Sequence, residues 1–199
     1  MTQKHTVFVV DDDRDFRESL SWMLEGAGHS VDAYASAESF LDHYKGGCGC
    51  LLLDVRMTGM SGLALQQTLN ERGFTLPVIV ITGHGDVAMA VQAMKNRALD
   101  FIEKPFDDEA LLTLVDSALA LAGQKHFAQT RKLEIQAAWQ SLSKRERQVA
   151  DLVVAGQANR EIAQNLEISI KTVEIHRSRA MAKMQAKCLA ELVSFSKEL

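Results

Sequence analysis

The amino-acid sequence predicts an α/β domain with a parallel sheet, followed by a smaller domain made only of helices. Short apolar runs alternate with amphipathic stretches in the first part of the chain, whereas the second part shows helical periodicity alone. The charge divides at the same place: residues 1–122 hold 9 Lys and Arg against 18 Asp and Glu, and residues 123–199 hold 13 against 8. An acidic domain joined to a basic one suggests that only the second contacts a polyanion.

Five short apolar runs are interpreted as strands, at residues 7–10, 30–34, 51–53, 78–81 and 101–102. Helical patterns follow them, at residues 15–27, 36–44, 61–72, 86–97 and 107–122. Because most of the runs are continuously apolar, the sheet is expected to be parallel and covered on both faces. A flavodoxin-like (βα)5 fold with strand order 2-1-3-4-5 is the expected arrangement for residues 1–122.

Residues 141–199 are interpreted as a small all-α domain of four helices. Apolar positions recur at helical spacing over residues 147–154, 160–166, 172–184 and 189–195. Ser143 and Glu146 have the spacing of a capping box, in which each side chain accepts a hydrogen bond from the other residue's backbone. Residues 123–140 are polar and helix-compatible, so a helical linker is predicted between the two domains.

The sequence also argues against membrane and secreted classes. Its N-terminus lacks the charged-then-apolar pattern of a secretion signal, and no apolar run approaches the roughly 20 residues that span a bilayer. Cys48 and Cys50 have no second pair of metal ligands nearby and Cys188 stands alone, so reduced structural thiols are expected. A cytoplasmic protein without membrane contact is therefore predicted.

Polar residues that end the apolar runs are the candidates for chemistry. Asp11 and Asp12 follow the first run, Asp54 the third, Thr82 the fourth and Lys104 the fifth. The carboxyl ends of parallel strands meet at one edge of a sheet, so these residues are expected together. Three neighbouring carboxylates need a cation, and a hard oxygen site suits Mg²⁺. One carboxylate could then attack phosphorus while Mg²⁺, the lysine and the threonine hydroxyl stabilise the phosphoryl oxygens.

A calcium-binding loop is excluded, although the first acidic cluster begins like one. Phe16 stands where an EF-hand loop requires Gly, and Trp22 stands where its bidentate Glu belongs.

Over residues 5–122 the chain resembles the receiver domains of two-component response regulators. The matching stretches are residues 9–13, 53–57 with 60–62, 81–86, and 100–106. The resemblance implies that Asp54 accepts phosphate from a sensor histidine kinase. It also implies that Asp12, Asp54 and the Arg56 backbone carbonyl ligate Mg²⁺, and that Asp11 acts on the metal through water.

The same resemblance implies a switch surface. Thr82 and Phe101 would relay phosphorylation to the face formed by the fourth helix and the fifth strand, through which a homodimer would form. Two positions depart from the family pattern. Thr58 replaces the usual Pro and is expected to loosen the loop after Asp54. Arg97 replaces the usual Gly at the end of the fourth helix, so either this residue is left-handed or the helix ends differently.

Residues 142–192 resemble the DNA-binding domain of the NarL/FixJ (LuxR-type) regulators, and with the receiver they indicate the FixJ-like branch. The carrying residues are found at 142–146, at Gly156, at 159–163, at 166–169 and at 172–176. A turn at 167–169 separates a scaffold helix from a helix whose first residues would face base edges in the major groove of double-stranded DNA. RNA polymerase is a further expected partner.

The second helix of this motif carries the expected DNA contacts. Val173, Ala180 and Met184 share one stripe and are expected in the core. The resemblance puts Glu174, Ile175 and Ser178 at base-reading positions. The expected DNA-contacting set is Lys171, Thr172, Glu174, Ile175, Arg177, Ser178, Arg179 and Lys183, with the basic members nearer phosphates.

Two alternative functions compete with a phosphorylation-switched transcription factor. A phosphatase of the haloacid-dehalogenase type would use Asp11 as nucleophile and Asp13 as acid, but Asp15 stands where that site expects Thr or Val, and the second domain stays unexplained. A phosphorylation-independent DNA-binding adaptor would not need the complete set of acidic, hydroxyl and lysine residues. Steady turnover of a phosphate ester would distinguish the enzyme from the regulator.

Overall fold

The computed structural model describes residues 5–83 and 85–199, and His84, within the matching stretch 81–86, lies outside them. The chain divides into two compact units, one ending at Phe127 and the other comprising Ala128–Leu199. No helix in the described part of the chain is both long and apolar enough to cross a membrane.

The first unit has the predicted parallel α/β architecture. Its strands are β1 (Thr6–Val10), β2 (Ser30–Tyr34), β3 (Gly49–Leu53), β4 (Val78–Thr82) and β5 (Asp100–Glu103). They form one parallel sheet in the order β2-β1-β3-β4-β5, which confirms the predicted order. The helices are α1 (Arg14–Gly26), α2 (Ala37–His43), α3 (Gly62–Glu71), α4 (Val87–Lys95) and α5 (Asp108–Gln140).

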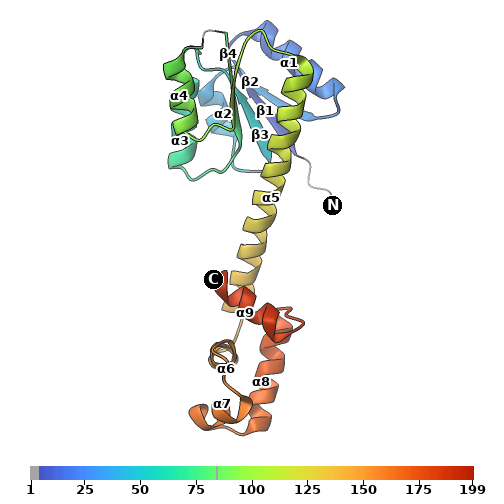
Figure 1. Ribbon diagram of the computed structural model, residues 1–199, viewed down its shortest axis with the longest axis vertical. Helices are drawn as coiled ribbons and strands as arrows, with labels where there is room; N and C mark the ends of the chain where they lie inside the picture. The colour runs from blue at the N-terminus through green and yellow to red at the C-terminus, as the bar shows by residue number, and fades with distance from the viewer. Residues whose placement is uncertain (1–4, 84) are drawn as a thin grey trace. The chain divides into compact units, whose positions relative to one another are not determined.

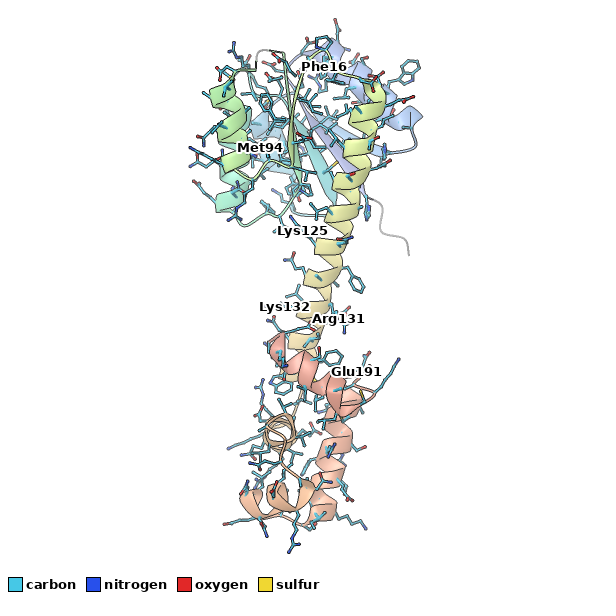
Figure 2. All side chains as sticks on the ribbon, in the orientation of Figure 1. Phe16, Met94, Lys125, Arg131, Lys132 and Glu191 are labelled. Atoms are coloured by element: carbon cyan, nitrogen blue, oxygen red, sulfur yellow. The ribbon has the colours of Figure 1, made fainter. Side chains whose placement is uncertain are left out.

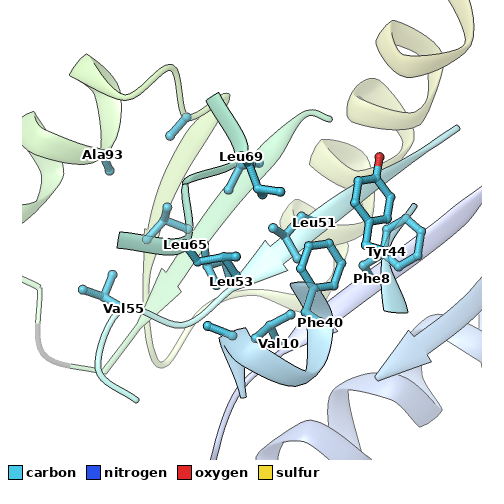
Figure 3. Close-up of a cluster of buried hydrophobic side chains, with 14 residues drawn as sticks. Phe8, Val10, Phe40, Tyr44, Leu51, Leu53, Val55, Leu65, Leu69 and Ala93 are labelled. Atoms are coloured by element: carbon cyan, nitrogen blue, oxygen red, sulfur yellow. The ribbon is translucent and has the colours of Figure 1, made fainter. Parts of the chain in front are cut away.

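Alternate strand residues build two separate cores, one on each face of the sheet. Phe8 and Val10 of β1 belong to a cluster with residues of α2, α3 and α4 (Figure 3), helices that are labelled in Figure 1. Val7 and Val9 of the same strand belong to a cluster with residues of α1 and α5. Since successive side chains of a strand point to opposite faces, a continuously apolar strand requires both faces to be covered.

The second unit is all α-helical. Its helices are α6 (Lys144–Val154), α7 (Asn159–Leu166), α8 (Ile170–Lys183) and α9 (Leu189–Lys197). Residues 123–140, expected as a linker, lie within α5, and Ile135 and Trp139 near the end of that helix are buried in the core of this unit. Val173, Ala180 and Met184 are buried, as their spacing predicted.

The cysteines differ in their surroundings. Cys48 and Cys50 are buried and unpaired, and burial raises the pKa of the Cys50 thiol to about 12. Cys188 is exposed at the N-terminal cap of α9, so it does not contribute to the core as a structural thiol.

The end of α4 settles how position 97 is accommodated. Arg97 is left-handed, with φ of 68°, whereas Asn96 before it has φ of −79°. Two hydrogen bonds close the helix end, from Ala98 N to Ala93 O at 2.9 Å and from Arg97 N to Met94 O at 3.0 Å. These bonds form a Schellman motif, which usually has Gly at its left-handed position. Arg97 therefore carries the steric cost of a Cβ in this conformation.

Replacing Arg97 with Gly should raise the free energy of unfolding of the first unit by about 1 kcal/mol, because Gly adopts the left-handed conformation without that cost. Urea unfolding followed by circular dichroism would measure the change. Arg72 is a matched control: it also ends a helix, but with φ of −77°. Arg72→Gly should lower stability by roughly 0.5–1 kcal/mol, through the larger entropy of the unfolded chain. Equal effects of the two substitutions would contradict the assignment of strain to Arg97.

Candidate functional site

The polar residues predicted at the carboxyl edge of the sheet lie together there. Asp54 N donates to Val10 O at 2.9 Å, which fixes the end of β3 beside the end of β1. Lys104 N donates to Thr82 O at 2.9 Å, which fixes the end of β5 beside the end of β4. The sheet pairing therefore continues one residue past these strands and sets the positions of the site residues.

Two buried carboxylates share one ammonium group at this edge. Asp11 is 3% exposed and Asp54 is 7% exposed. The Nζ of Lys104 donates to Asp11 Oδ2 at 2.7 Å and to Asp54 Oδ1 at 3.3 Å. Since buried carboxylates are stable as anions only when paired, the lysine compensates the charge of both.

Burial also changes the acidity of Asp54. Desolvation raises the pKa of its carboxyl above the usual value, the charge of Asp11 adds to that effect, and Lys104 opposes it. A hydrogen bond from the Arg56 backbone also favours the charged form. A partly desolvated carboxylate beside a cation is the arrangement expected of a nucleophile that attacks an anionic phosphoryl group.

Asp12 is held in a different way, by position 58. The backbone N–H and the hydroxyl of Thr58 donate to Asp12 Oδ2 at 2.7 Å and 2.9 Å. The backbone hydrogen bond is the main reason that the pKa of Asp12 is lowered. Proline at position 58 could make neither hydrogen bond, because it has no N–H and no hydroxyl to donate. These two bonds oppose the expected loosening of the loop, which stays a prediction.

The acidic residues suit a hard cation by their chemistry. Among residues 5–83 and 85–199, no three His, Cys, Asp or Glu side chains are grouped as they would be around a metal ion. Asp12 bonds to Thr58, and Lys104 bonds to the other two carboxylates. These three carboxylates nonetheless carry more negative charge than the ammonium group of Lys104 compensates. Carboxylate oxygens are also the preferred ligands of Mg²⁺.

Thr82 and Phe101, the expected switch pair, flank Gly85. Thr82 is 1% exposed, and Phe101 is partly buried against the core of α2, α3 and α4. A Cβ added to Gly85 would lie 3.0 Å from Phe101 Cε1 and 3.5 Å from Thr82 Cγ2. Gly85 therefore permits the close approach of the chain to both side chains, a role that the sequence pattern alone did not identify.

Gly62, the first residue of α3, lies in the matching stretch 60–62, but the sequence did not identify its structural role. A Cβ on Gly62 would overlap the backbone carbonyl oxygen of Asp54. The N–H of Gly62 donates to Val55 O at 3.0 Å. The missing side chain thus lets α3 begin directly against the backbone of the central acidic residue.

An exposed apolar stripe on α4 was also missed. Val87, Val91 and Met94 are 82%, 46% and 52% exposed, and Met94 is labelled in Figure 2. Their spacing of four and three residues puts them on one side of the helix. The heptad-like signal was present in the sequence, but it could not tell a buried stripe from an exposed one.

In the second unit, the residues expected to read bases are accessible. Glu167 is left-handed with φ of 53°, and Ser169 then caps α8 by accepting a hydrogen bond from Thr172 N. The exposed residues of α8 include Lys171, Glu174, Ile175, Ser178 and Arg179, which lie opposite its buried stripe. Lys171, Glu174 and Ile175 belong to the first half of α8, the part of a recognition helix that contacts base edges in helix-turn-helix proteins.

Two basic residues of the expected DNA-contacting set are engaged within the domain. Lys183 donates to Glu146 Oε2 at 2.7 Å and to Ser141 O at 3.1 Å. Arg177 donates to Asn159 Oδ1 at 3.0 Å and is partly buried. These contacts brace α8 against α6 and α7.

Comparisons with known proteins agree over both units. The response regulator receiver domain family matches residues 7–116, and the bacterial regulatory proteins of the luxR family match residues 140–196. FixJ of Bradyrhizobium diazoefficiens is 42% identical over 194 residues, which are 97% of this chain and 95% of FixJ. TodT of Pseudomonas putida is 43% identical over 97% of this chain and 86% of TodT. The structure of the response regulator StyR is similar with a TM-score of 0.90 at 40% identity, covering 98% of this chain and all of the StyR chain.

The ion pair of Glu146 should make the second unit sensitive to acid. The hydrogen bond from Lys183, followed by that from Ser143, lowers the pKa of Glu146 to about 2. The folded-state pKa is below the unfolded value of about 4.3, so the stabilisation is present above that value and is lost as the pH falls towards 2. Glu146→Gln should lower stability at pH 7 and flatten its pH dependence below pH 5.

Fluorescence of Trp139, which is 7% exposed, would report unfolding of this unit in a Trp22→Phe background. Glu161 provides the control, because it accepts a hydrogen bond from the N-cap residue of α7 in the same manner and has no ion pair among the described residues. Glu161→Gln should keep the acid dependence. Loss of that dependence in both variants would contradict the role given to the lysine.

Proposed function

This chain belongs to the NarL/FixJ family of two-component response regulators, transcription factors that join a receiver domain to a LuxR-type DNA-binding domain, and we propose that Asp54 is its phosphoacceptor. The two domains imply a histidine kinase and DNA as partners. The observation that carries the proposal is the pair of hydrogen bonds from Lys104 to Asp54 and Asp11, which puts a cation beside a buried nucleophile.

Phosphoryl transfer would proceed by attack of an Asp54 carboxylate oxygen on phosphorus. The new oxygen–phosphorus bond makes Asp54 an acyl phosphate. The bond from phosphorus to the donor atom, a phosphohistidine nitrogen or a small-molecule oxygen, breaks, and its electron pair stays on the donor atom. Lys104 lies where it can follow the developing charge from the carboxylate to the phosphoryl oxygens. Thr82, at the end of the neighbouring strand, would donate its hydroxyl to the same oxygens. The protein thus assists its own phosphorylation and dephosphorylation without being a turnover enzyme.

Magnesium would be held by Asp12, Asp54 and the Arg56 carbonyl, with Asp11 acting through water. When bound, Mg²⁺ would neutralise the excess carboxylate charge and the phosphoryl oxygens. The phosphatase alternative fits the residues less well. Asp13, its expected acid, accepts hydrogen bonds from Asp15 N and Phe16 N and caps α1.

The apolar stripe of Val87, Val91 and Met94 supports dimerisation through α4 and β5. Phosphorylation of Asp54 would bias Thr82 and Phe101, and so the position of this face, between two states. Two copies of the chain would bury the same stripe in an isologous interface. A dimer would present two copies of α8 to two half-sites in DNA, from which it would act on transcription with RNA polymerase.

In the DNA complex, Glu174, Ile175 and Ser178 would contact base edges. Phosphates would be contacted by Lys171 and Arg179, and by Thr172 in the first turn of α8. Lys183 and Arg177 would act first in bracing α8, because both already donate to partners within the domain.

Asp54→Asn should abolish phosphorylation, because an amide is not a usable nucleophile. Intact-mass measurement after incubation with acetyl phosphate and Mg²⁺ should show one added phosphoryl group on the protein with the original sequence and none on the Asp54→Asn variant. Asp13→Asn, which alters the cap of α1, should leave the added mass in place. Full modification of the Asp54 variant would refute the assignment.

Phosphorylation with acetyl phosphate, followed by sedimentation, tests whether the dimer forms through α4. Val91→Asp should accept phosphate at Asp54 but remain monomeric in sedimentation, because it puts a charge in the middle of the stripe that the dimer would bury. Trp22→Ser changes another exposed apolar residue, 80% exposed on α1, and should leave the dimer intact. A phosphorylated Val91→Asp protein that dimerises normally would argue against this face.

Glu174→Ala should relax base preference at one operator position, where the carboxylate contributes roughly 1–3 kcal/mol of discrimination. Non-specific affinity should stay equal or rise, because a charge that repels phosphate is removed. Arg179→Ala should instead weaken binding to all sequences and reduce the salt slope by about 1. Binding-site selection together with a salt titration distinguishes the two, and identical behaviour of both variants would show that α8 is placed wrongly.

A further inference from the structure

The ammonium group of Lys104 lies over the face of an aromatic ring. The Nζ of Lys104 is 3.5 Å from the centroid of the Phe16 ring. The same nitrogen donates to Asp11 and Asp54, and only 21% of the lysine side chain is exposed. The ring therefore covers one side of the ammonium group, which would otherwise be hydrated by water.

Phe16 is itself fixed from two directions. Its backbone N–H donates to the Asp13 carboxylate at 3.1 Å, in the cap of α1. Its ring packs edge-to-face against Phe106, with centroids 6.2 Å apart and planes at 85°. Since Phe106 follows Lys104 by two residues, the ring and the ammonium are held by the same two segments. Phe16 is labelled in Figure 2.

We propose that Phe16 is a positioning residue for phosphoryl transfer, and that its ring face holds the Lys104 ammonium against Asp54. This inference rests on the proposed role of Asp54 as the phosphoacceptor. The negative face of an aromatic ring attracts a cation most strongly where water is excluded. An aliphatic side chain of similar size would pack in the same space but would leave that side of the ammonium uncompensated.

The surroundings of the ring give it a second effect. Phe16 and Lys104 both line a cavity of about 440 Å³, together with Leu20, Met23 and Phe106. A smaller or mobile side chain at position 16 would open the ammonium to water in that cavity. Lys104 would then sample positions away from Asp54, and the electrostatic preorganisation for transfer would be reduced.

The competing explanation is that Phe16 serves only the packing of α1. In that case the rate of phosphorylation would follow stability, and any apolar side chain that packs would serve. The two explanations separate when ring electrons are changed at nearly constant volume. Phe16→Tyr keeps the ring face, Phe16→Leu removes it, and 4-cyanophenylalanine at position 16 keeps the shape but weakens the face.

The test uses the full-length protein with Mg²⁺ and a concentration series of acetyl phosphate, and intact mass gives the rate of phosphorylation. Affinity for beryllofluoride, measured by calorimetry, gives a second readout that involves no bond formation. Phe16→Leu should lower the limiting rate about tenfold and weaken beryllofluoride binding by a similar factor, as expected for loss of a desolvated cation–π contact. Phe16→Tyr should stay within about twofold of the unmodified protein, and the cyano-substituted ring should fall between.

Leu24→Ala is the stability control, because Leu24 lies in the core on the same helix, is 0% exposed and does not line that cavity. It should lower the melting temperature at least as much as Phe16→Leu and leave the rate unchanged. An unchanged rate in Phe16→Leu, or equal losses in the leucine, tyrosine and cyano-substituted proteins, overturns the inference and leaves Asp54 as phosphoacceptor. Absence of phosphorylation in the unmodified protein overturns the proposed function itself.

Discussion

Charge compensation by Lys104 is the constraint on which the first domain depends. Asp11 and Asp54 are both buried, and two such carboxylates repel each other unless a cation lies close to both. The cation comes from the end of β5, and three strand pairings, β1 with β3, β3 with β4 and β4 with β5, separate it from β1. The whole sheet must therefore be in register before Lys104 reaches Asp11 at 2.7 Å. The geometry of the site therefore depends on correct pairing of the strands from β1 to β5.

The position of α4 depends on side-chain amides of α3. Gln66, which is 1% exposed, donates to Ala93 O at 3.1 Å, and Asn70 donates to Asn96 O at 2.6 Å. These carbonyls belong to the last turn of α4 or to its cap, where helical partners run out. The amides and the left-handed Arg97 together define where α4 ends. The exposed apolar stripe of α4 is thereby carried on a helix whose end is fixed by contacts with α3.

The DNA-binding domain uses polar contacts in a comparable way. The capping box of Ser143 and Glu146 is formed, with hydrogen bonds of 2.8 Å and 3.3 Å. The same carboxylate then receives Lys183 from the end of α8. One acidic residue thus starts α6 and holds α8 against it. This arrangement directs Lys183 into the domain and leaves Lys171 and Arg179 on the exposed face for a polyanion.

The sequence by itself determined the periodicities and therefore the elements: strands ending at Asp11, Asp54 and Thr82, the cap at Ser143, and the buried stripe of Val173. Each of these follows from local chemistry that neighbouring residues reveal. Only the tertiary structure decided which donors meet which acceptors. The bonds from Thr58 to Asp12 span 46 residues, and those from Lys104 to the two carboxylates span 93 and 50. The ring of Phe16 over Lys104 is a contact of the same kind, because side-chain pairing between distant segments depends on packing that no local pattern encodes.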